Sequence, residues 1–254
     1  MYEPGPLWPK TQSDHCRLYV HTLSGPQELG RIPPCLRVHE CRVFIVPLAA
    51  MAASLLELRA VLSSEERRRA DDFHFARDAA MFAVIHGVLR HLLARLLATA
   101  PEAVGFTVQP GGKPALAPGF SDSLRFNISH SRSYAAVALA RNFELGVDIE
   151  DVRPMDDMQE LARDCLHPWE ARCIEAAVGP DAALRQFYAI WTQKEAVLKA
   201  LGEGLRIPLH SFRVPGEAEG WAKVPDSVHL NGPLYVSTLQ NRDWMGAVAL
   251  ARPV

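Results

Sequence analysis

Hydrophobic positions in the first half of the chain follow first a strand pattern and then a helical one. Residues 42 to 49, RVFIVPLA, form a nearly continuous apolar run that predicts a buried strand. The following segment, LSSEERRRADDF, predicts a helix whose start carries a capping box of Ser63 and Glu66. Between residues 77 and 97, apolar side chains at helical spacing predict a long amphipathic helix; they are Phe82, Ile85, Leu89, Leu92, Leu93 and Leu96.

The same order of elements recurs about 104 residues later. ELGVDIEDV predicts a strand, LHPWEARCIEAA a short helix, and FYAIWTQKEAVLKAL a long helix. The segment FAVIHGVLRHLL, from residue 82, shares Phe and Ile with FYAIWTQKEAVL, from residue 187, at the first and fourth places. Two amphipathic helices can match this far by chance, but the shared order of elements favours a duplication.

The predicted fold is therefore α+β, with two similar α/β subdomains in tandem, related by a pseudo-twofold axis. We expect the active site in the cleft between them. The repeat divides the chain into an N-terminal extension, partly irregular, at 1–40, an N-terminal subdomain at 41–143 and a C-terminal subdomain at 144–254. Because one chain contains both halves, a monomer is expected.

The two long helices differ in chemistry. Residues four apart stack on one face of a helix, and in the second helix one such set is Trp191, Glu195 and Lys199. Aligned at an offset of 105, the first helix has His86, Arg90 and Ala94. The acidic chemistry is thus expected in the C-terminal subdomain.

Composition restricts the class of protein. The 254 residues are 48% hydrophobic and 22% charged, as in a soluble globular protein, and a formal net charge of -2 does not suggest a nucleic-acid binder. The five cysteines include no C-x-x-C pair, which favours reduced thiols. No stretch reaches the roughly 18 apolar residues of a membrane span, and the proline-rich start does not resemble a signal peptide. We expect a cytoplasmic protein with neither a nucleic-acid nor a membrane partner.

Two acids interrupt the apolar strand at 144–152. Asp148 and Glu150 are separated by one residue, so they share one face of the strand, where an unpaired carboxylate is costly. A cation or a helix N-terminus is expected beside them. With Glu195 they could form an all-oxygen cage for magnesium. The alternative for Glu195 and Lys199 is an exposed ion pair on one helix.

Two further motifs are open to more than one interpretation. In NISHS, Ser129 and His130 are adjacent and so diverge, which disfavours a serine nucleophile; the segment suits a phosphate-receiving turn, or a cap formed by Ser131. Lys113 in QPGGKPAL lies in a turn, and EERRRADD suggests a solvated helix face. Either becomes a phosphate contact only if the fold brings it to the cleft.

Taken in order, these motifs resemble those of a known family. The combination of G-K-P, N-I-S-H-S, G-V-D-I-E and F-Y-x-I-W-T-x-K-E-A-x-x-K-A-x-G-x-G-L, over about 60 to 215, is similar to that of the 4′-phosphopantetheinyl transferases. It most resembles the larger, pseudo-dimeric type that activates surfactin synthetase. The first 40 or so residues have no such support. The resemblance implies transfer of the phosphopantetheine arm of coenzyme A to a serine of an apo acyl, aryl or peptidyl carrier protein, with release of adenosine 3′,5′-bisphosphate.

The resemblance also assigns roles to individual residues. It implies magnesium ligands at Asp148, Glu150 and Glu195. It implies coenzyme A contacts at Lys113, Ser129 and His130, with Arg69 at the 3′-phosphate and Lys199 beside the reacting phosphate. The expected catalytic residues are Asp148, Glu195 and Lys199, with Glu195, or a water that it holds, as the general base.

The chain departs from its relatives at three positions. Met81 and Phe82 stand where many relatives carry an arginine and a small hydroxylated residue, and Glu66 stands where they tend to have lysine. Fewer cations should weaken coenzyme A binding unless nearby arginines compensate. Two other functions stay open: a catalytically idle module that binds coenzyme A or a carrier protein, and a metal-dependent phosphohydrolase. The motifs do not distinguish fatty acid, polyketide and nonribosomal peptide synthesis.

Overall fold

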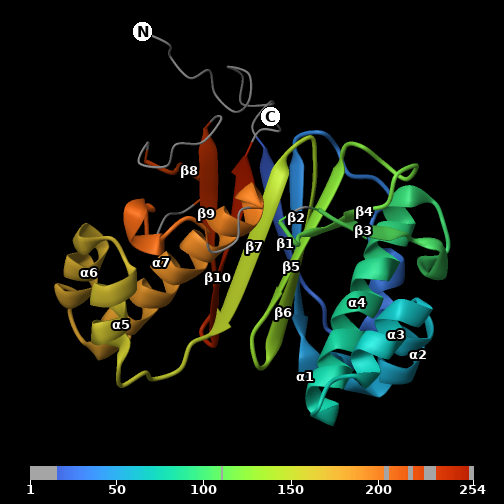
Figure 1. Cartoon of the computed structure of the whole chain (residues 1–254), viewed down its shortest axis with the longest axis horizontal. Coiled ribbons are helices and arrows are strands. Elements are labelled where there is room, and N and C mark those ends of the chain that lie inside the picture. Colours follow the sequence, from blue (N-terminus) through green and yellow to red (C-terminus); the bar gives the residue numbers. More distant parts are fainter. Residues whose placement is uncertain (1–15, 110, 203–205, 217–219, 226–232, 252–254) are drawn as a thin grey trace, which may run out of the picture.

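Two four-stranded sheets meet in the middle of the molecule (Figure 1). The computed structural model describes residues 16–109, 111–202, 206–216, 220–225 and 233–251. The first sheet has the order β1-β2-β6-β5, formed by β1 (Arg17–Thr22), β2 (Glu40–Pro47), β5 (Leu124–His130) and β6 (Tyr134–Arg141). The second has the order β7-β10-β9-β8, formed by β7 (Glu144–Asp151), β8 (Ala222–Lys223), β9 (Leu234–Gln240) and β10 (Trp244–Ala251). A short hairpin of β3 (Phe106–Val108) and β4 (Pro114–Leu116) lies beside the first sheet.

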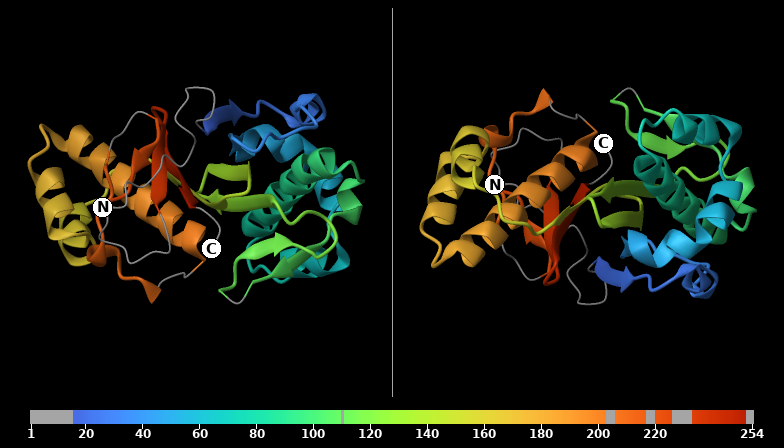
Figure 2. Two further views of the ribbon diagram at one scale, coloured as in Figure 1. Left: turned by 90° about the horizontal axis from the view of Figure 1, so that it is seen from above. Right: turned by 90° about the horizontal axis from the view of Figure 1, so that it is seen from below.

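Helices cover the outer face of each sheet, so that seen from above the strands lie between two helical ends (Figure 2). The first half carries α1 (Leu48–Met51), α2 (Leu55–Ala60), α3 (Ser64–Asp71) and α4 (Ala76–Leu97). The second half carries α5 (Met158–Cys165), α6 (Pro168–Glu175) and α7 (Pro180–Leu201). Short 3-10 helices occur at η2 (Pro26–Arg31), η3 (Ala52–Ser54), η4 (Pro101–Ala103) and η6 (Leu209–Ser211). This is the α+β fold with tandem halves that the element pattern predicts.

The two halves correspond element by element. The bounds of β2 and β7, of α3 and α6, and of α4 and α7 are each 104 residues apart, and those of β5 and β9 and of β6 and β10 are 110 apart. Strand order agrees as well, since β6 lies between β2 and β5 just as β10 lies between β7 and β9. The predicted duplication is therefore present in the fold, and the extra residues of the second half fall after α7.

Ion pairs whose cation is buried repeat at the same offset. The predicted capping box of Ser63 and Glu66 starts α3, and a second box starts α6 with Glu170 as its acid. The Glu66 carboxylate accepts a hydrogen bond from Arg90 Nε of α4 at 2.7 Å, and the Glu170 carboxylate lies 2.8 Å from Lys194 Nζ of α7. The buried cation of each long helix thus bonds to the acid at the start of the short helix, which joins α4 to α3 and α7 to α6.

These pairs correct the predicted alignment of the long helices. Glu66 corresponds to Glu170 and Arg90 to Lys194, which requires an offset of 104 rather than 105. The positions equivalent to Glu195 and Lys199 are consequently His91 and Arg95, not Arg90 and Ala94. The match of apolar residues misaligned the helices by one position. Where a helix is buried on two faces, adjacent positions are both apolar, so the apolar pattern fits at either offset.

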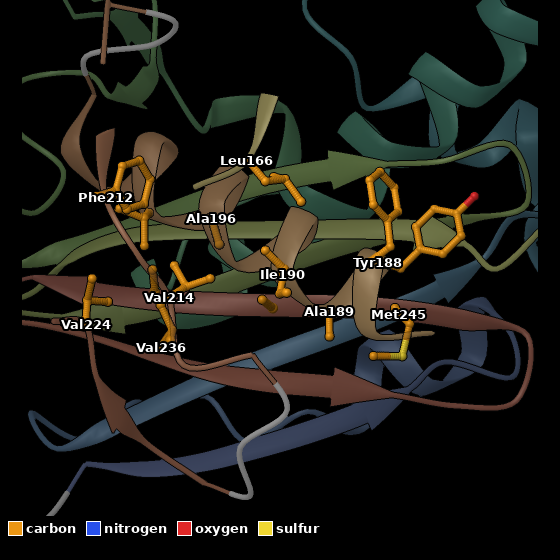
Figure 3. Close-up of a cluster of buried hydrophobic side chains, with 14 of the residues drawn as sticks. Leu166, Tyr188, Ala189, Ile190, Ala196, Phe212, Val214, Val224, Val236 and Met245 are labelled. Atoms are coloured by element: carbon orange, nitrogen blue, oxygen red, sulfur yellow. The ribbon is translucent and has the colours of Figure 1, made fainter. Parts of the chain in front are cut away.

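Three clusters of apolar side chains make the core. One lies between the first sheet and α4, a second between the second sheet and α7 (Figure 3), and a third between the two sheets. Alternation along β7 sends Val147 and Ile149 into the third cluster. Asp148 and Glu150 therefore share the opposite face, as their spacing predicts, and this face is turned toward α7. Gly146 shares that face, and a Cβ added there would lie 2.0 Å from the backbone oxygen of Ala196, so β7 and α7 approach very closely.

The expected N-terminal extension is only partly described. Residues 1–15 lie outside the described residues, and β1, within the expected extension, is an edge strand of the first sheet, parallel to β2. Within the described residues, α4 is the one helix long and apolar enough to span a membrane, by length and composition alone. Because 67% of that apolar window is buried, α4 has the surroundings of a core helix.

Candidate active site

Asp148 lies at the centre of a polar cluster on the seam between the two halves. Its side chain is buried, and its Oδ1 lies 2.6 Å from Lys199 Nζ of α7. Ser129, at the end of β5, donates to the same Oδ1 at 2.7 Å and accepts from Lys199 Nζ at 2.9 Å. Lys199 Nζ also donates to the Val147 carbonyl at 3.2 Å. The positive partner expected beside Asp148 is thus, in the protein alone, the Lys199 ammonium.

One carboxylate oxygen of this cluster is left unpaired. Asp148 Oδ2 is buried and has no hydrogen-bond partner among the described residues. A buried oxygen without a partner costs free energy, so a ligand that supplies positive charge would be favoured there. No three His, Cys, Asp or Glu side chains in the described parts of the chain are already grouped to hold a metal. The predicted trio of Asp148, Glu150 and Glu195 is therefore not preassembled.

The electrostatics of the other two acids place them near Asp148. The pKa of Glu150 is raised to about 7, first by burial and then by the negative charge of Asp148. Burial, and then Asp148, also raises the pKa of Glu195. Crowded carboxylates of this kind favour a bound cation, and oxygen donors suit magnesium. The donor set and the unpaired Asp148 Oδ2 therefore fit a divalent cation.

The cluster opens into a chain of cavities. A cavity of about 650 Å³ is lined by Ser129, His130, Asp148, Glu150 and Lys199, together with Arg69 and Phe73 of the first half. Lys199 also lines a cavity of about 330 Å³ that contains Glu195. Arg69 also lines a third cavity, of about 400 Å³, with Phe82 and Glu66. The cleft between the halves is thus polar at its centre and apolar toward the first half.

Of the predicted coenzyme A contacts, His130 and Arg69 reach this cleft with free surface. His130, at the end of β5, keeps part of its surface exposed, while partial burial of the ring and then the positive charge of Lys199 lower its pKa. A neutral imidazole can accept one hydrogen bond and donate another. The guanidinium of Arg69, on α3, stands over the Phe82 ring with its carbon 5.3 Å from the ring centre.

Lys113 is held by the protein itself. Its Nζ donates to the Leu145 carbonyl at 2.8 Å and lies 3.6 Å from Glu144 Oε2, and only 8% of its side chain is exposed. Burial lowers the pKa of this ammonium. The turn that carries Lys113 packs closely on the end of α7. A Cβ added at Gly111 would lie only 2.0 Å from the Gly202 carbonyl oxygen. Lys113 thus ties the β3–β4 hairpin to the start of β7, and it lines the cavity that contains Glu195.

Glu66 and Phe82, at two of the departures, both have partners within the first half. Burial alone would raise the pKa of Glu66, but hydrogen bonds from His86, the Ser63 backbone and Arg90 lower it to about 2. Phe82 stacks on His86 with ring centres 3.9 Å apart. The Glu66 carboxylate, which lines the 400 Å³ cavity, is therefore ionised and hydrogen-bonded to His86 and Arg90.

Two residues to which the sequence analysis gave no role organise the seam; one of them, Asn127, is the first residue of the NISHS motif. Asn127 Oδ1 accepts the Val147 N–H at 2.8 Å, which joins β5 to β7 across the two sheets. Asp151 accepts the Arg132 N–H at 3.0 Å and so joins the β5–β6 turn to the end of β7. The signal for Asn127 was a buried amide within an apolar strand, which needs a buried partner.

Comparisons with known proteins agree with this arrangement. Residues 144–241 match the 4'-phosphopantetheinyl transferase superfamily, and residues 49–142 match the N-terminal domain of 4'-phosphopantetheinyl transferases. The chain is 36% identical over 177 residues to the 4'-phosphopantetheinyl transferase HetI of Nostoc sp., which covers 68% of this chain and 74% of the relative. A 4'-phosphopantetheinyl transferase of Bacillus subtilis is 30% identical over 199 residues, covering 77% of this chain and 85% of the relative.

The Bacillus subtilis transferase Sfp is also similar, at 29% identity over 195 residues, covering 76% of this chain and 83% of the relative. The matched segments include both halves and the polar cluster on their seam. The chain belongs to the 4′-phosphopantetheinyl transferase family.

Proposed function

We propose that this transferase moves the 4′-phosphopantetheine arm of coenzyme A to a serine of an apo acyl, aryl or peptidyl carrier protein, in the cleft between its halves. The observation that supports this most is the cluster of Asp148, Ser129 and Lys199 at the floor of the 650 Å³ cavity. It combines a cation for phosphate, a carboxylate oxygen that has no hydrogen-bond partner among the residues the structure describes, and space for a substrate. Catalysis is assigned to Asp148, Glu195 and Lys199.

Cations from both halves bind the phosphates of coenzyme A in this proposal. Lys199 lies where two cavities join, so its ammonium can contact the pyrophosphate as well as Asp148. Ser129 and His130 supply a hydroxyl and an imidazole beside it, and Arg69 contacts the 3′-phosphate from the first half. Lys113 lines the cavity that contains Glu195 and Lys199, and is proposed to contact coenzyme A there while it ties the β3–β4 hairpin to the start of β7.

A magnesium ion is proposed as the cofactor, held by Asp148, Glu150 and Glu195. The support is chemical. These donors are oxygen atoms, Asp148 Oδ2 is buried without a hydrogen-bond partner in the described part of the chain, and burial beside the Asp148 charge raises the pKa values of both glutamates. When bound, the ion would neutralise charge on the pyrophosphate.

The protein residues then handle the proton. The carrier serine Oγ forms a bond to the phosphorus of the arm while the bond between this phosphorus and the bridging oxygen breaks. Glu195, directly or through a water, accepts the serine proton. Lys199 stabilises the charge on the departing adenosine 3′,5′-bisphosphate.

The decisive experiment is incubation of the protein with coenzyme A, magnesium and an apo carrier protein, followed by mass spectrometry of the carrier. A mass gain equal to the arm supports transfer. Free phosphate with an unmodified carrier would indicate a phosphohydrolase, and an unmodified carrier without phosphate would indicate an idle binding module. We also propose a cytoplasmic monomer with subdomains at 41–143 and 144–254, for which light scattering in solution tests the oligomeric state.

A further inference from the structure

The open edge of β7 is bonded by side chains and not by a neighbouring strand. β7 is an edge strand, because its sheet has the order β7-β10-β9-β8. Along this edge, the Leu145 carbonyl accepts from Lys113 Nζ at 2.8 Å. The next outward residue is Val147, whose carbonyl accepts from Lys199 Nζ at 3.2 Å and whose N–H donates to Asn127 Oδ1 at 2.8 Å. An open strand edge would otherwise present these backbone groups without partners.

Alternate residues of β5 bond to β7 across the seam. Because successive side chains alternate along a strand, Arg125, Asn127 and Ser129 lie on one face of β5. Arg125 donates to Glu144 in a partly exposed ion pair, which fixes little, whereas Asn127 and Ser129 are both buried. In the described parts of the chain, no backbone–backbone hydrogen bond joins β5 to β7. The register between the two strands therefore depends on these side chains and on core packing.

The duplicated half shows the same strand edge in a covered form. At the offset of 104, Val43 of β2 is the counterpart of Val147 of β7. The edge of β2 at Val43 pairs with β1, so its backbone groups need no side-chain partner. At the offset of 110 that relates β5 to β9, the counterpart of Asn127 is Ser237. The amide at position 127 thus accompanies the open edge, and this edge carries the polar cluster of the seam.

The Lys199 ammonium depends on this register for two of its three bonds. Its Nζ donates to the Val147 carbonyl at 3.2 Å, to Ser129 Oγ at 2.9 Å and to Asp148 Oδ1 at 2.6 Å. An ammonium has three N–H groups, so these three acceptors use them all. Asn127 is hydrogen-bonded to Val147 and lies two residues from Ser129 on the same face of β5. A shift of β5 along β7 would therefore separate Ser129 from the ammonium.

We propose that Asn127 is a positioning residue for the transfer reaction. It fixes the register of β5 on β7 and so keeps Ser129 at hydrogen-bond distance from both Asp148 and Lys199. The inference rests on the proposed function, in which Lys199 stabilises the charge on the leaving group. Asn127 acts through its amide oxygen, because this is the atom that accepts the Val147 N–H. Misplacement of the cluster lowers the rate of the chemical step more than it weakens binding of the ground state.

The test compares Asn127→Leu with Asn127→Asp. Leucine is similar in size but accepts no hydrogen bond, whereas aspartate keeps an oxygen for the Val147 N–H. We expect Asn127→Leu to lower kcat roughly tenfold or more, while the KM for coenzyme A changes less than about threefold. Asn127→Asp should keep kcat within about threefold and raise the KM for coenzyme A, because Asn127 lines the cavity that holds this anion in the proposed function.

The matched control is Ser237→Ala. Ser237 is buried at the equivalent position of β9 and lies outside the residues that line the 330 and 650 Å³ cavities. This variant should change neither kcat nor KM. A wild-type kcat in Asn127→Leu would overturn the inference. An equal loss of kcat in Asn127→Leu and Asn127→Asp would also overturn it, because the NH₂ group of Asn127 would then act on the co-substrate. If Asn127→Leu does not fold, the kcat of Asn127→Asp decides alone.

A crystal structure of Asn127→Leu measures the register without the reaction. Ser129 Oγ should lie beyond hydrogen-bond distance of Lys199 Nζ, and an unchanged cluster would overturn the inference even if transfer were slow. If the wild-type protein transfers no arm, the proposed function fails, while a displaced Ser129 would still support the role of Asn127 in the register. If the wild type transfers normally and both variants do too, only the inference on Asn127 fails.

Discussion

The buried pair of Lys194 and Glu170 provides the sharpest test of how α7 is held. Both side chains are 0% exposed. Lys194 Nζ lies 2.8 Å from Glu170 Oε2 and donates to the carbonyls of Leu209 and Phe212, while Glu170 Oε1 accepts the Val214 N–H at 2.8 Å. Replacing Lys194 by methionine keeps the length of the side chain but leaves a buried carboxylate without its cation. It also removes a donor from two carbonyls.

The expected loss follows from these contacts. Removing one partner of a fully buried ion pair costs about 3–5 kcal/mol, a large part of the roughly 5–15 kcal/mol that stabilises a protein. For a chain of this size, a loss of about 4 kcal/mol corresponds to a fall in Tm of about 10 °C. We therefore expect Lys194→Met to be folded but much less stable. Because Glu195 is the next residue of α7, its transfer activity should also fall.

Equilibrium urea unfolding of Lys194→Met, Glu170→Leu and the double variant measures the effect as a double-mutant cycle. The double variant should recover most of the loss, because no charge stays buried without a partner. A loss below about 1 kcal/mol in Lys194→Met would refute the reasoning, since it would mean that the carboxylate is readily hydrated or protonated. Losses that simply add in the double variant would show that the two residues do not interact.

Three other changes test the seam. Lys199→Met should abolish transfer. In calorimetry without coenzyme A it should raise the affinity for magnesium about tenfold, because the ammonium 2.6 Å from Asp148 repels a dication. Arg163→Met on α5 is the control, and weaker magnesium binding by Lys199→Met would contradict the expectation. Glu150→Gln tests the raised pKa of about 7, caused by burial and then by Asp148. Because the folded state holds this proton more tightly, its stabilising effect is complete below the unfolded pKa and is lost as the pH rises through about 7. Without magnesium, the wild type should therefore lose stability relative to Glu150→Gln between about pH 5 and about pH 8, and parallel stability curves would argue against it. Gly146→Ala should destabilise the protein by about 1–3 kcal/mol in urea unfolding, because its Cβ would lie 2.0 Å from the Ala196 carbonyl oxygen. The control is Gly30→Ala, whose Cβ would have nothing within 4 Å, and equal stability of the two variants would disprove the close approach of β7 and α7.

Local patterns in the sequence determined the elements and their order. The capping box at Ser63 and Glu66, the helical spacing of α4 and the recurrence of strand, short helix and long helix all predict what the fold contains. The shared face of Asp148 and Glu150 follows from strand alternation alone. These features depend on residues close together in the chain, so spacing is sufficient to reveal them.

Contacts between distant segments were decided by the tertiary structure. Two ion pairs, Glu66 with Arg90 and Glu170 with Lys194, align the long helices at an offset of 104. Helical periodicity alone does not distinguish this offset from 105. Lys199 reaches Asp148 because Gly146 lets α7 approach β7, and Lys113 is tied to Glu144 because the hairpin folds over the end of α7. Burial and close approach decide which charged groups meet, and these properties exist only after the elements have packed.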